Sequence, residues 1–296
     1  AAYGVFHKVD EAKEFISQTG APIVVKADGL AAGKGVVVAM TIEEANAAVE
    51  DMLSGNRFGE AGSTVVIEEF MEGEEASLLA FVDGKTVVPM IASQDHKRIF
   101  DGDKGPNTGG MGTYAPAPVL TAALRDEAMK TILEPMVAAM EKEGMPYVGC
   151  LYAGLMITPQ GPKVVEFNAR FGDPETQVVL PLLDSDLGQI MMACATGTLT
   201  TDMVKWKDSS AACVILASKG YPETSSKGDI ISGDIKQHDT TIVFHSGTKL
   251  VGDEYVTNGG RVLGVVGLGK DLRTALDRAY GRIEHINFEG MQYRTD

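Results

Sequence analysis

Three polar residues alternate with apolar ones between positions 164 and 170. They are Glu166, Asn168 and Arg170. Because side chains alternate along a β-strand, the three would project from one face, opposite Val165 and Phe167. Carboxylate and amide oxygens suit a hard cation such as Mg²⁺, and a nearby guanidinium can bind phosphate. The spacing predicts a site for a metal and a phosphate, although it is also typical of the exposed face of an amphipathic strand.

The segment that follows carries two more carboxylates. Asp173 and Glu175 stand in the sequence FGDPETQ at residues 171–177. A loop of this kind could bind an amine or a ribose. We also expect a helix to start here, with Asp173 as its N-cap and Pro174 in its first turn. The two roles are compatible with each other.

A second polar cluster lies earlier in the chain. The sequence QDHKR at 94–98 includes Asp95, His96 and Lys97, and the glycine-rich stretch 105–112 follows it closely. Backbone amides in such a stretch can form an anion-binding nest, so a polyphosphate could bind here. We interpret residues 94–118 as one long loop, because they are polar and rich in glycine and proline, and a loop of this length is usually either functional or disordered. His96 taken alone is more typical of a structural histidine.

A glycine- and alanine-rich stretch at 29–35 contains Lys34, and Lys26 precedes it. It differs from a P-loop because its glycines are one residue too close, Gly35 stands where a hydroxyl residue would bind magnesium, and the next segment is expected to be a strand. We interpret it as a lid over a polyphosphate between two antiparallel strands. A flexible hairpin loop without a function would have the same composition.

The composition excludes several classes of protein. With 296 residues the chain is long enough for two domains. A formal net charge of −15 and an aromatic content of 6% argue against binding to nucleic acid or to an anionic membrane. No apolar run approaches the ~18 residues of a membrane span. The cysteines at 150, 194 and 213 are expected to be buried free thiols, which indicates a cytoplasmic protein, and no motif supports zinc or serine hydrolase chemistry.

These residues need elements that bring distant segments together. Helices are predicted from hydrophobic spacing, and strands from short apolar runs. Thr41 and Glu44 form a capping box at the start of one helix, and Pro135 should bend another. The expected helices cover 8–18, 41–53, 121–142, 178–195 and 271–285, and the expected strands cover 23–26, 36–39, 64–70, 78–82, 86–92, 147–157, 163–169, 211–217, 241–245 and 261–266.

Four motifs, in this order, resemble the phosphoribosylamine–glycine ligase family of the ATP-grasp superfamily. They are KADGLAAGKG at 26–35, QDHKR at 94–98, GPNTGGMG at 105–112 and RFGDPE at 170–175. The resemblance continues through GTK at 247–249 and TNGGRVL at 257–263, so it covers nearly the whole chain. It implies an α/β fold of α+β lobes: an ATP-grasp domain at 1–200 with a lid subdomain at about 8–70, then a smaller strand-rich domain at 211–296.

The resemblance also implies a reaction. Members of this family use ATP and Mg²⁺ (or Mn²⁺) to convert glycine to glycyl phosphate, which phosphoribosylamine then attacks to give glycinamide ribonucleotide, ADP and phosphate in purine biosynthesis. Such phosphoryl transfer needs positioning and charge neutralisation rather than a covalent nucleophile. The implied roles are ATP binding for Lys26, Lys34, Glu69, Phe70 and Glu75; metal binding for Glu166 and Asn168; catalysis for Lys34, Arg170 and Asp173; and substrate contact for Asp95, Lys97, Asp173 and Glu175.

One part of the family pattern has no match here, an N-terminal α/β domain with a glycine-rich phosphate loop. We therefore expect a monomeric fragment that keeps ATP and metal binding but loses most ligase activity, with small molecules as its only partners. Two alternatives stay open. One is another ATP-grasp carboxylate–amine ligase, against which the RFGDPE loop argues. The other is a catalytically silent nucleotide-binding module, against which the intact Lys34, Glu166 and Arg170 argue.

Overall fold

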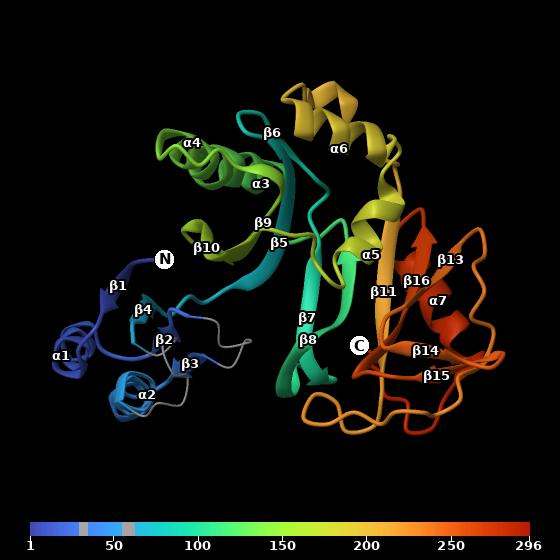
Figure 1. Cartoon of the computed structure of the whole chain (residues 1–296), viewed down its shortest axis with the longest axis horizontal. Coiled ribbons are helices and arrows are strands. Elements are labelled where there is room, and N and C mark those ends of the chain that lie inside the picture. The colour runs from blue at the N-terminus through green and yellow to red at the C-terminus, as the bar shows by residue number, and fades with distance from the viewer. Residues whose placement is uncertain (30–34, 55–62) are drawn as a thin grey trace. The chain divides into compact units, whose positions relative to one another are not determined.

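A computed structural model describes residues 1–29, 35–54 and 63–296. The chain divides into two compact units, Ala1–Gly73 and Glu74–Asp296 (Figure 1). The first unit encloses the segment expected to form the lid subdomain. The second continues without a break across the domain boundary expected near residues 200–210, so the division at 1–200 and 211–296 stays a prediction.

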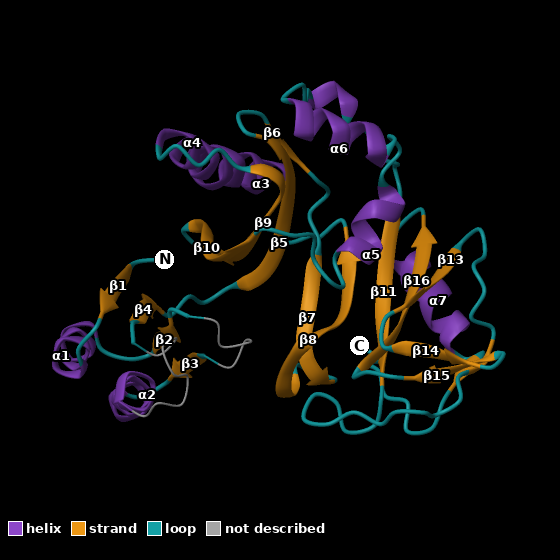
Figure 2. Cartoon of the chain, in the orientation of Figure 1, coloured by secondary structure: helices purple, strands orange, loops and turns teal. Residues whose placement is uncertain are grey.

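The first unit is an antiparallel sheet with two helices on one face (Figure 2). Its core is made by alternate residues of the inner strands, such as Val25 and Ile67, against Ile16 and Val49 of the helices. Thr41 Oγ1 accepts a hydrogen bond from the Glu44 amide at 3.2 Å, as the capping box predicts, and the Glu44 carboxylate accepts one from the Met40 amide at 2.8 Å. The strands, in sheet order, are β1 (Tyr3–Phe6), β4 (Val65–Glu69), β2 (Ile23–Ala27) and β3 (Val36–Ala39), and the helices are α1 (Val9–Thr19) and α2 (Ile42–Ser54).

The second unit begins with a four-stranded sheet that is buried on both faces. Even-numbered residues of its central strand, such as Leu78 and Ala80, pack in one core with the helices after residue 121, while Leu79 and Phe81 pack in another core with α6. This explains the unbroken apolar run in that strand. The elements are β10 (Gly161–Asn168), β9 (Val148–Thr158), β5 (Glu74–Asp83) and β6 (Val87–Pro89) in sheet order, with α3 (Ala122–Ala128), α4 (Glu134–Lys142), α5 (Thr176–Val179) and α6 (Leu187–Thr196).

Two helix predictions differ from the structure in this region. The expected bend at Pro135 is a π-helical turn, Met129–Leu133, with Pro135 in the first turn of α4. The single helix expected at 178–195 is wrong: α5 ends at Val179, a 3₁₀ turn at Leu180–Leu182 contains Pro181, and α6 starts afresh. Asp186 caps α6 by accepting a hydrogen bond from the Gln189 amide at 3.0 Å, so a proline and a new N-cap divide the apolar run.

The long loop expected at 94–118 is also wrong. Residues Gln94–Phe100 form β7 and Lys104–Ala115 form β8, two strands of a five-stranded sheet. Pairing with β11 overrides the glycine-rich composition of β8, and register shifts after His96 and Arg98 accommodate its irregular part. The sheet order is β13 (Thr241–His245), β16 (Arg261–Gly269), β11 (Ser210–Ala217), β8 and β7.

The remaining elements lie after residue 200. Helix α7 (Leu272–Ile283) packs on β16 and β11, with Ala279 and Ile283 in a shared core with Val214 and Val265. The shorter elements are a 3₁₀ turn (Thr201–Met203), β12 (Ser232–Gly233), β14 (Thr248–Val251), β15 (Glu254–Thr257) and β17 (Ile286–Asn287). Within the described ranges, we find no helix that is both long and apolar enough to cross a membrane.

Two glycines near α7 give a matched pair of stability predictions. A Cβ at Gly267 would lie 2.0 Å from the Ala275 carbonyl oxygen, whereas a Cβ at Gly281, inside α7, would meet nothing within 4 Å. Gly267→Ala should therefore force the helix off the strand and lower the free energy of unfolding by about 3 kcal/mol or more. Gly281→Ala should raise it by ~1 kcal/mol through helix propensity. Urea unfolding of the two variants tests the contrast, and equal midpoints would contradict it.

Candidate active site

The site residues expected in the first unit lie at the ends of its central strands. Lys26 of β2 forms an ion pair with Glu68 of β4, with Nζ and Oε2 2.7 Å apart. Glu69 is the last residue of β4, its amide bonds to the Ala2 carbonyl oxygen at 2.9 Å, and Phe70 follows it. Lys34 lies outside the described residues. The other candidate residues belong to the second unit.

The metal-and-phosphate motif lies at the end of β10. Asn168 Nδ2 donates a hydrogen bond to Glu166 Oε1 at 3.0 Å, so the two side chains share a face as expected. A bulge between Val164 and Glu166 puts Val164, rather than Val165, beside Phe167 in the core. The expected position of Val165 was therefore wrong, because period-2 spacing fails where a residue is inserted.

Arg170 lies beyond the end of β10, which stops at Asn168. Its guanidinium carbon is 5.7 Å from the centre of the Tyr152 ring, and Nη1 donates to the Phe171 carbonyl oxygen at 3.0 Å. Both contacts restrain a side chain that is otherwise exposed. The arrangement keeps a permanent positive charge two residues beyond the end of the strand that carries the Glu166–Asn168 pair.

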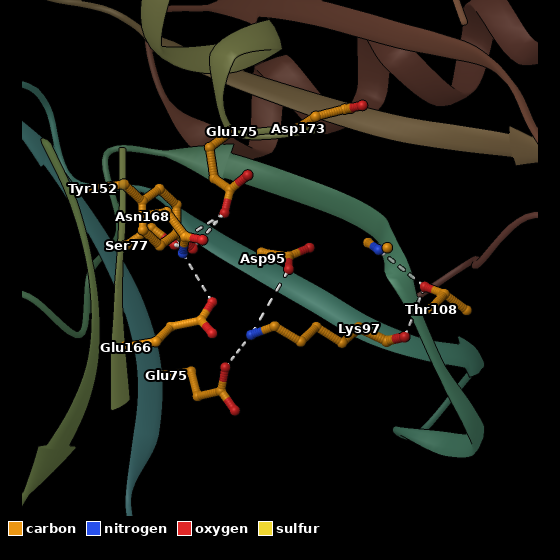
Figure 3. A network of polar contacts seen from close by, with 12 residues as sticks. Glu75, Ser77, Asp95, Lys97, Thr108, Tyr152, Glu166, Asn168, Asp173 and Glu175 are labelled. Atoms are coloured by element: carbon orange, nitrogen blue, oxygen red, sulfur yellow. Dashed lines mark hydrogen bonds and ion pairs between the residues drawn. The ribbon is translucent and has the colours of Figure 1, made fainter. Parts of the chain in front are cut away.

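Glu175 is buried, with 4% of its surface exposed. Its Oε1 accepts hydrogen bonds from Ser77 at 3.1 Å and from Tyr152 at 2.8 Å, and the two hydroxyls are 2.7 Å apart (Figure 3). Burial and the Glu175 charge raise the pKa of Tyr152 well above its usual range. Sequence reasoning missed Ser77 and Tyr152, which come from β5 and β9 and carry no motif of their own.

Asp95 and Lys97 project from β7 toward the same region, where Figure 3 shows Lys97 between Asp95 and Glu75. Lys97 forms a close ion pair with Glu75 and lies 3.9 Å from Asp95 Oδ2. Burial and the Glu175 charge raise the pKa of Asp95 to about 7, because Lys97 offsets them only in part. Burial lowers the pKa of Lys97, but the negative charges of Glu75 and Asp95 outweigh burial and raise that pKa above its ordinary value.

Asp173 is held by a residue from the far end of the chain. Arg261, at the start of β16, donates to Asp173 Oδ2 and to its carbonyl oxygen, both at 2.9 Å, and to the Gly109 carbonyl oxygen at 2.6 Å. Asp173 Oδ1 accepts from the Gln177 side chain at 2.7 Å. The helix start expected at Asp173 is wrong, because α5 begins at Thr176 and the carboxylate binds side chains instead. Sequence reasoning assigned Arg261 no role beyond its place in the TNGGRVL motif.

The pKa of Asp95 predicts how stability depends on pH. Between about pH 4 and 7 the folded protein holds a proton on Asp95 that the unfolded chain has lost, so the free energy of unfolding falls as pH rises. Asp95→Asn removes this penalty, which is at most ~4 kcal/mol. We expect the variant to gain stability over the parent chain as pH rises from 4 to 8. Urea unfolding at several pH values measures the gap, and parallel curves would contradict the assignment.

The donor atoms suit a hard metal ion that is completed by another ligand. With Asn168 Nδ2 bonded to Glu166 Oε1, the amide oxygen and the second carboxylate oxygen can both coordinate. In the part of the chain that is described, no group of three or more His, Cys, Asp or Glu side chains is arranged to bind a metal. A carboxylate and an amide fit Mg²⁺ that takes its other ligands from phosphates and water.

Two family models match the chain. Residues 1–176 match the ATP-grasp (A) domain of phosphoribosylglycinamide synthetase, and residues 211–296 match the C domain of the same enzyme. A phosphoribosylamine–glycine ligase of Neisseria meningitidis is 54% identical over 299 residues, which cover 100% of this chain and 70% of that protein. The ligase of Caulobacter vibrioides is 56% identical with the same coverage.

Solved structures give the same picture. The crystal structure of the Thermotoga maritima phosphoribosylamine–glycine ligase superposes with a TM-score of 0.90 at 35% identity, covering 100% of this chain and 74% of that one. The biotin carboxylase domain of the Hydrogenobacter thermophilus 2-oxoglutarate carboxylase, in complex with MgADP, superposes with a TM-score of 0.75 at 16% identity, covering 98% and 62%. The second likeness is one of fold alone, and it agrees with the ATP-grasp architecture. The two family models and relatives more than 50% identical along the whole chain show that this protein belongs to the phosphoribosylamine–glycine ligase family.

Proposed function

We propose that this chain binds ATP, a divalent metal and glycine for a ligase that joins glycine to 5-phosphoribosylamine through glycyl phosphate. The products are glycinamide ribonucleotide, ADP and phosphate. The observation that carries the proposal is the arrangement in the second unit, where the Glu166–Asn168 pair of β10 lies in the same region as the carboxylates of Asp95, on β7, and of Glu175, at the start of α5 (Figure 3). The Glu166–Asn168 pair suits a metal–phosphate complex, and the two carboxylates of Asp95 and Glu175 suit a cationic substrate.

The charge of each side chain decides the role that we propose for it. Glu166 and Asn168 would hold Mg²⁺, or Mn²⁺, which neutralises phosphate charge when bound. Arg170 would bind the phosphoryl group as its charge develops during transfer, since its guanidinium is already restrained by Tyr152. Lys26 and Lys34 would contact the ATP phosphates, Glu69 and Phe70 the adenine, and Glu75 the ribose.

The carboxylates of Asp95, Asp173 and Glu175 would bind the amine groups of the two substrates. Glu175 is fixed by Ser77 and Tyr152, and Asp173 is fixed by Arg261, so both are positioned before a substrate arrives. Lys97 lies between Asp95 and Glu75 and limits the negative charge of the site. We propose that Asp95, Lys97, Asp173 and Glu175 line the place where glycine and phosphoribosylamine meet.

The cysteines support a cytoplasmic location. All three are buried free thiols. Burial raises the pKa of Cys150 to about 12, so its thiol is unreactive at neutral pH. Free structural thiols of this kind are typical of proteins kept in a reducing compartment.

The proposal is tested by substrate dependence. The chain is incubated with ATP, Mg²⁺, glycine and freshly generated phosphoribosylamine, and ADP and glycinamide ribonucleotide are measured. We expect product only when all four are present. Replacing glycine by alanine or aspartate, and phosphoribosylamine by ammonia, tests for another carboxylate–amine ligase. Faster turnover with a different acid would contradict the assignment, and ATP binding without any turnover would favour a silent nucleotide-binding module.

A further inference from the structure

A buried arginine outside the candidate active site joins the segment after α7 to the β7–β8 hairpin. Arg294 has 6% of its surface exposed. Its Nη1 donates to Asp103 Oδ1 at 2.7 Å and to the Arg98 carbonyl oxygen at 3.2 Å. Its Nε and Nη2 bind the two carboxylate oxygens of Asp296, at 2.8 and 2.7 Å. The hydrogen bonds to Asp296 and Asp103 raise the pKa of Arg294 above its ordinary value, so the charge is permanent.

Two further contacts lie beside this arginine. Thr295 donates to the Asp101 carboxylate from its amide, at 2.8 Å, and from its hydroxyl. The Gly102 amide donates to Asp296 Oδ2 at 2.8 Å. These partners form the turn between β7 and β8. The segment after α7 therefore binds the far end of the hairpin, residues 98–107, which we call the hairpin tip.

The segment that carries Arg294 is itself fixed in the second unit. Gln292 exchanges two backbone hydrogen bonds with Ala217 of β11, at 2.8 and 3.0 Å. Tyr293 packs against the core that α7 shares with β11 and β16. The Tyr280 hydroxyl of α7 donates to the Arg294 carbonyl oxygen at 3.0 Å. Arg294 therefore extends toward the hairpin tip from a part of the chain that the sheet and α7 hold in place.

The hairpin alone leaves its tip weakly fixed. His96 pairs with Gly112, and two positions later Arg98 pairs with Asn107, so two steps along β7 correspond to five along β8. A second register shift follows closer to the turn. Extra residues of this kind interrupt the ladder of hydrogen bonds and bend the strand. The ladder therefore does not by itself set the tilt of the tip relative to the regular part of the hairpin, which carries Asp95.

Lys97 joins the hairpin tip to that regular part. Its carbonyl oxygen accepts a hydrogen bond from Thr108 Oγ1 at 2.8 Å, and its Nζ pairs closely with Glu75 and lies 3.9 Å from Asp95 Oδ2. The glycine-rich stretch 105–112 starts within the tip. A change in the tilt of the tip would shift the Lys97 charge and the first amides of that stretch. Displacements of about 1 Å at groups that bind a substrate can cost ~100-fold in rate.

We propose that Arg294 is a positioning residue for substrate binding by this enzyme. Its guanidinium holds the carboxylates of Asp103 and Asp296 together, and the hairpin tip that carries Asp103 in turn sets the position of Lys97. Without this charge the two carboxylates would repel each other, and the tip would separate from the segment after α7. The inference rests on the proposed function, because Lys97 contacts a substrate only under that proposal.

Arg294→Met removes the charge and keeps much of the apolar volume of the side chain. Hydrogen exchange of the full chain, read by mass spectrometry, should be roughly 10-fold faster for peptides from the hairpin tip and unchanged for peptides from β9. The kcat/KM for glycine and for phosphoribosylamine should fall about 10- to 100-fold, mainly through KM, because contacts made before the transition state are lost. The Kd for ATP should not change. Arg294→Lys should recover part of the loss, since it keeps the charge without the planar guanidinium.

Asp103→Asn tests whether Arg294 acts through the turn. Asp103 has a φ of 52°, which asparagine also tolerates, so this variant loses the charge without straining the backbone. We expect a smaller fall in kcat/KM in the same direction. The double variant should be no worse than Arg294→Met alone, because both changes remove the same contact.

Arg282→Met is the matched control for a general loss of stability. Arg282 of α7 is 9% exposed, pairs closely with Asp234, and donates to the Lys236 carbonyl oxygen at 2.6 Å. Like Arg294→Met, the variant removes a buried charge that is paired with a carboxylate, so both melting temperatures should fall by similar amounts. Exchange of the hairpin tip and kcat/KM should change only in Arg294→Met.

Each outcome has a distinct meaning. Unchanged exchange of the hairpin tip in Arg294→Met would overturn the proposal. Faster exchange with unchanged kcat/KM, or an equal fall of kcat/KM in Arg282→Met, would overturn the positioning role and leave the proposed ligase function intact. A parent chain that forms no glycinamide ribonucleotide, but whose tip exchanges faster in Arg294→Met, would count against the proposed function and support the structural role of Arg294.

Discussion

Glu166→Ala should reduce glycine-dependent ADP formation by roughly 10²–10³-fold, comparable to the loss of one strong electrostatic contact in a transition state. The variant loses the only carboxylate of the Glu166–Asn168 pair and leaves Asn168 Nδ2 without its partner. We expect the Mg²⁺ concentration needed for half-maximal rate to rise as well. A coupled assay of ADP release across a Mg²⁺ series measures both effects.

Glu141→Ala is the matched control for this prediction. Glu141 lies near the end of α4, is about half exposed, and its Oε1 is 3.9 Å from Lys85 Nζ. Its loss should leave the rate and the Mg²⁺ dependence unchanged. If Glu166→Ala lowered the rate but needed no more Mg²⁺ than the parent chain, a structural role would replace metal binding as the explanation.

Arg170→Met should lower kcat by a similar factor, roughly 10²–10³-fold, with little change in the Kd for ATP. The reason is that the proposed contact forms with charge that appears on the phosphoryl group during transfer. Arg170→Lys should recover part of the loss, because it keeps the charge without the planar guanidinium that stands over the Tyr152 ring. Single-turnover measurements of ADP formation separate the chemical step from ATP binding.

Arg125→Met provides the comparison for Arg170. Arg125 lies on α3 and pairs with its neighbour Asp126 at 2.8 Å on the protein surface. Removing it should change neither kcat nor ATP binding. A Kd for ATP that rises as much as kcat falls in Arg170→Met would assign Arg170 to ground-state binding instead.

The sequence predicted those parts of the site that depend on neighbours in the chain. The Glu166–Asn168 pair follows from the two-residue period of a strand, and the Thr41–Glu44 capping contact follows from the four-residue geometry of a helix start. Both survive in the structure, even though a bulge shifts Val165. Local rules work here because the interacting atoms belong to the same element.

Other features depend on pairing between distant segments and could not be predicted in this way. Asp95 and Glu175 affect each other across 80 positions, and Arg261 reaches Asp173 across 88 positions. The segment expected to be a loop became β7 and β8 because β11 provides a partner that the local composition does not reveal. Ser77 and Tyr152 acquire their roles only when Glu175 is buried between them.

The pairing of β8 with β11 has a consequence for the order in which the protein is made. Ala115 of β8 is the partner of Ala211, roughly a hundred residues later in the chain, so a ribosome needs about 5–20 s to supply the second strand. During that time one edge of β8 has open hydrogen-bonding groups, which could pair with other nascent chains. The sheet that contains the hairpin carrying Asp95 and Lys97 is therefore completed late in synthesis, and slower translation between residues 115 and 211 should increase aggregation of the nascent chain.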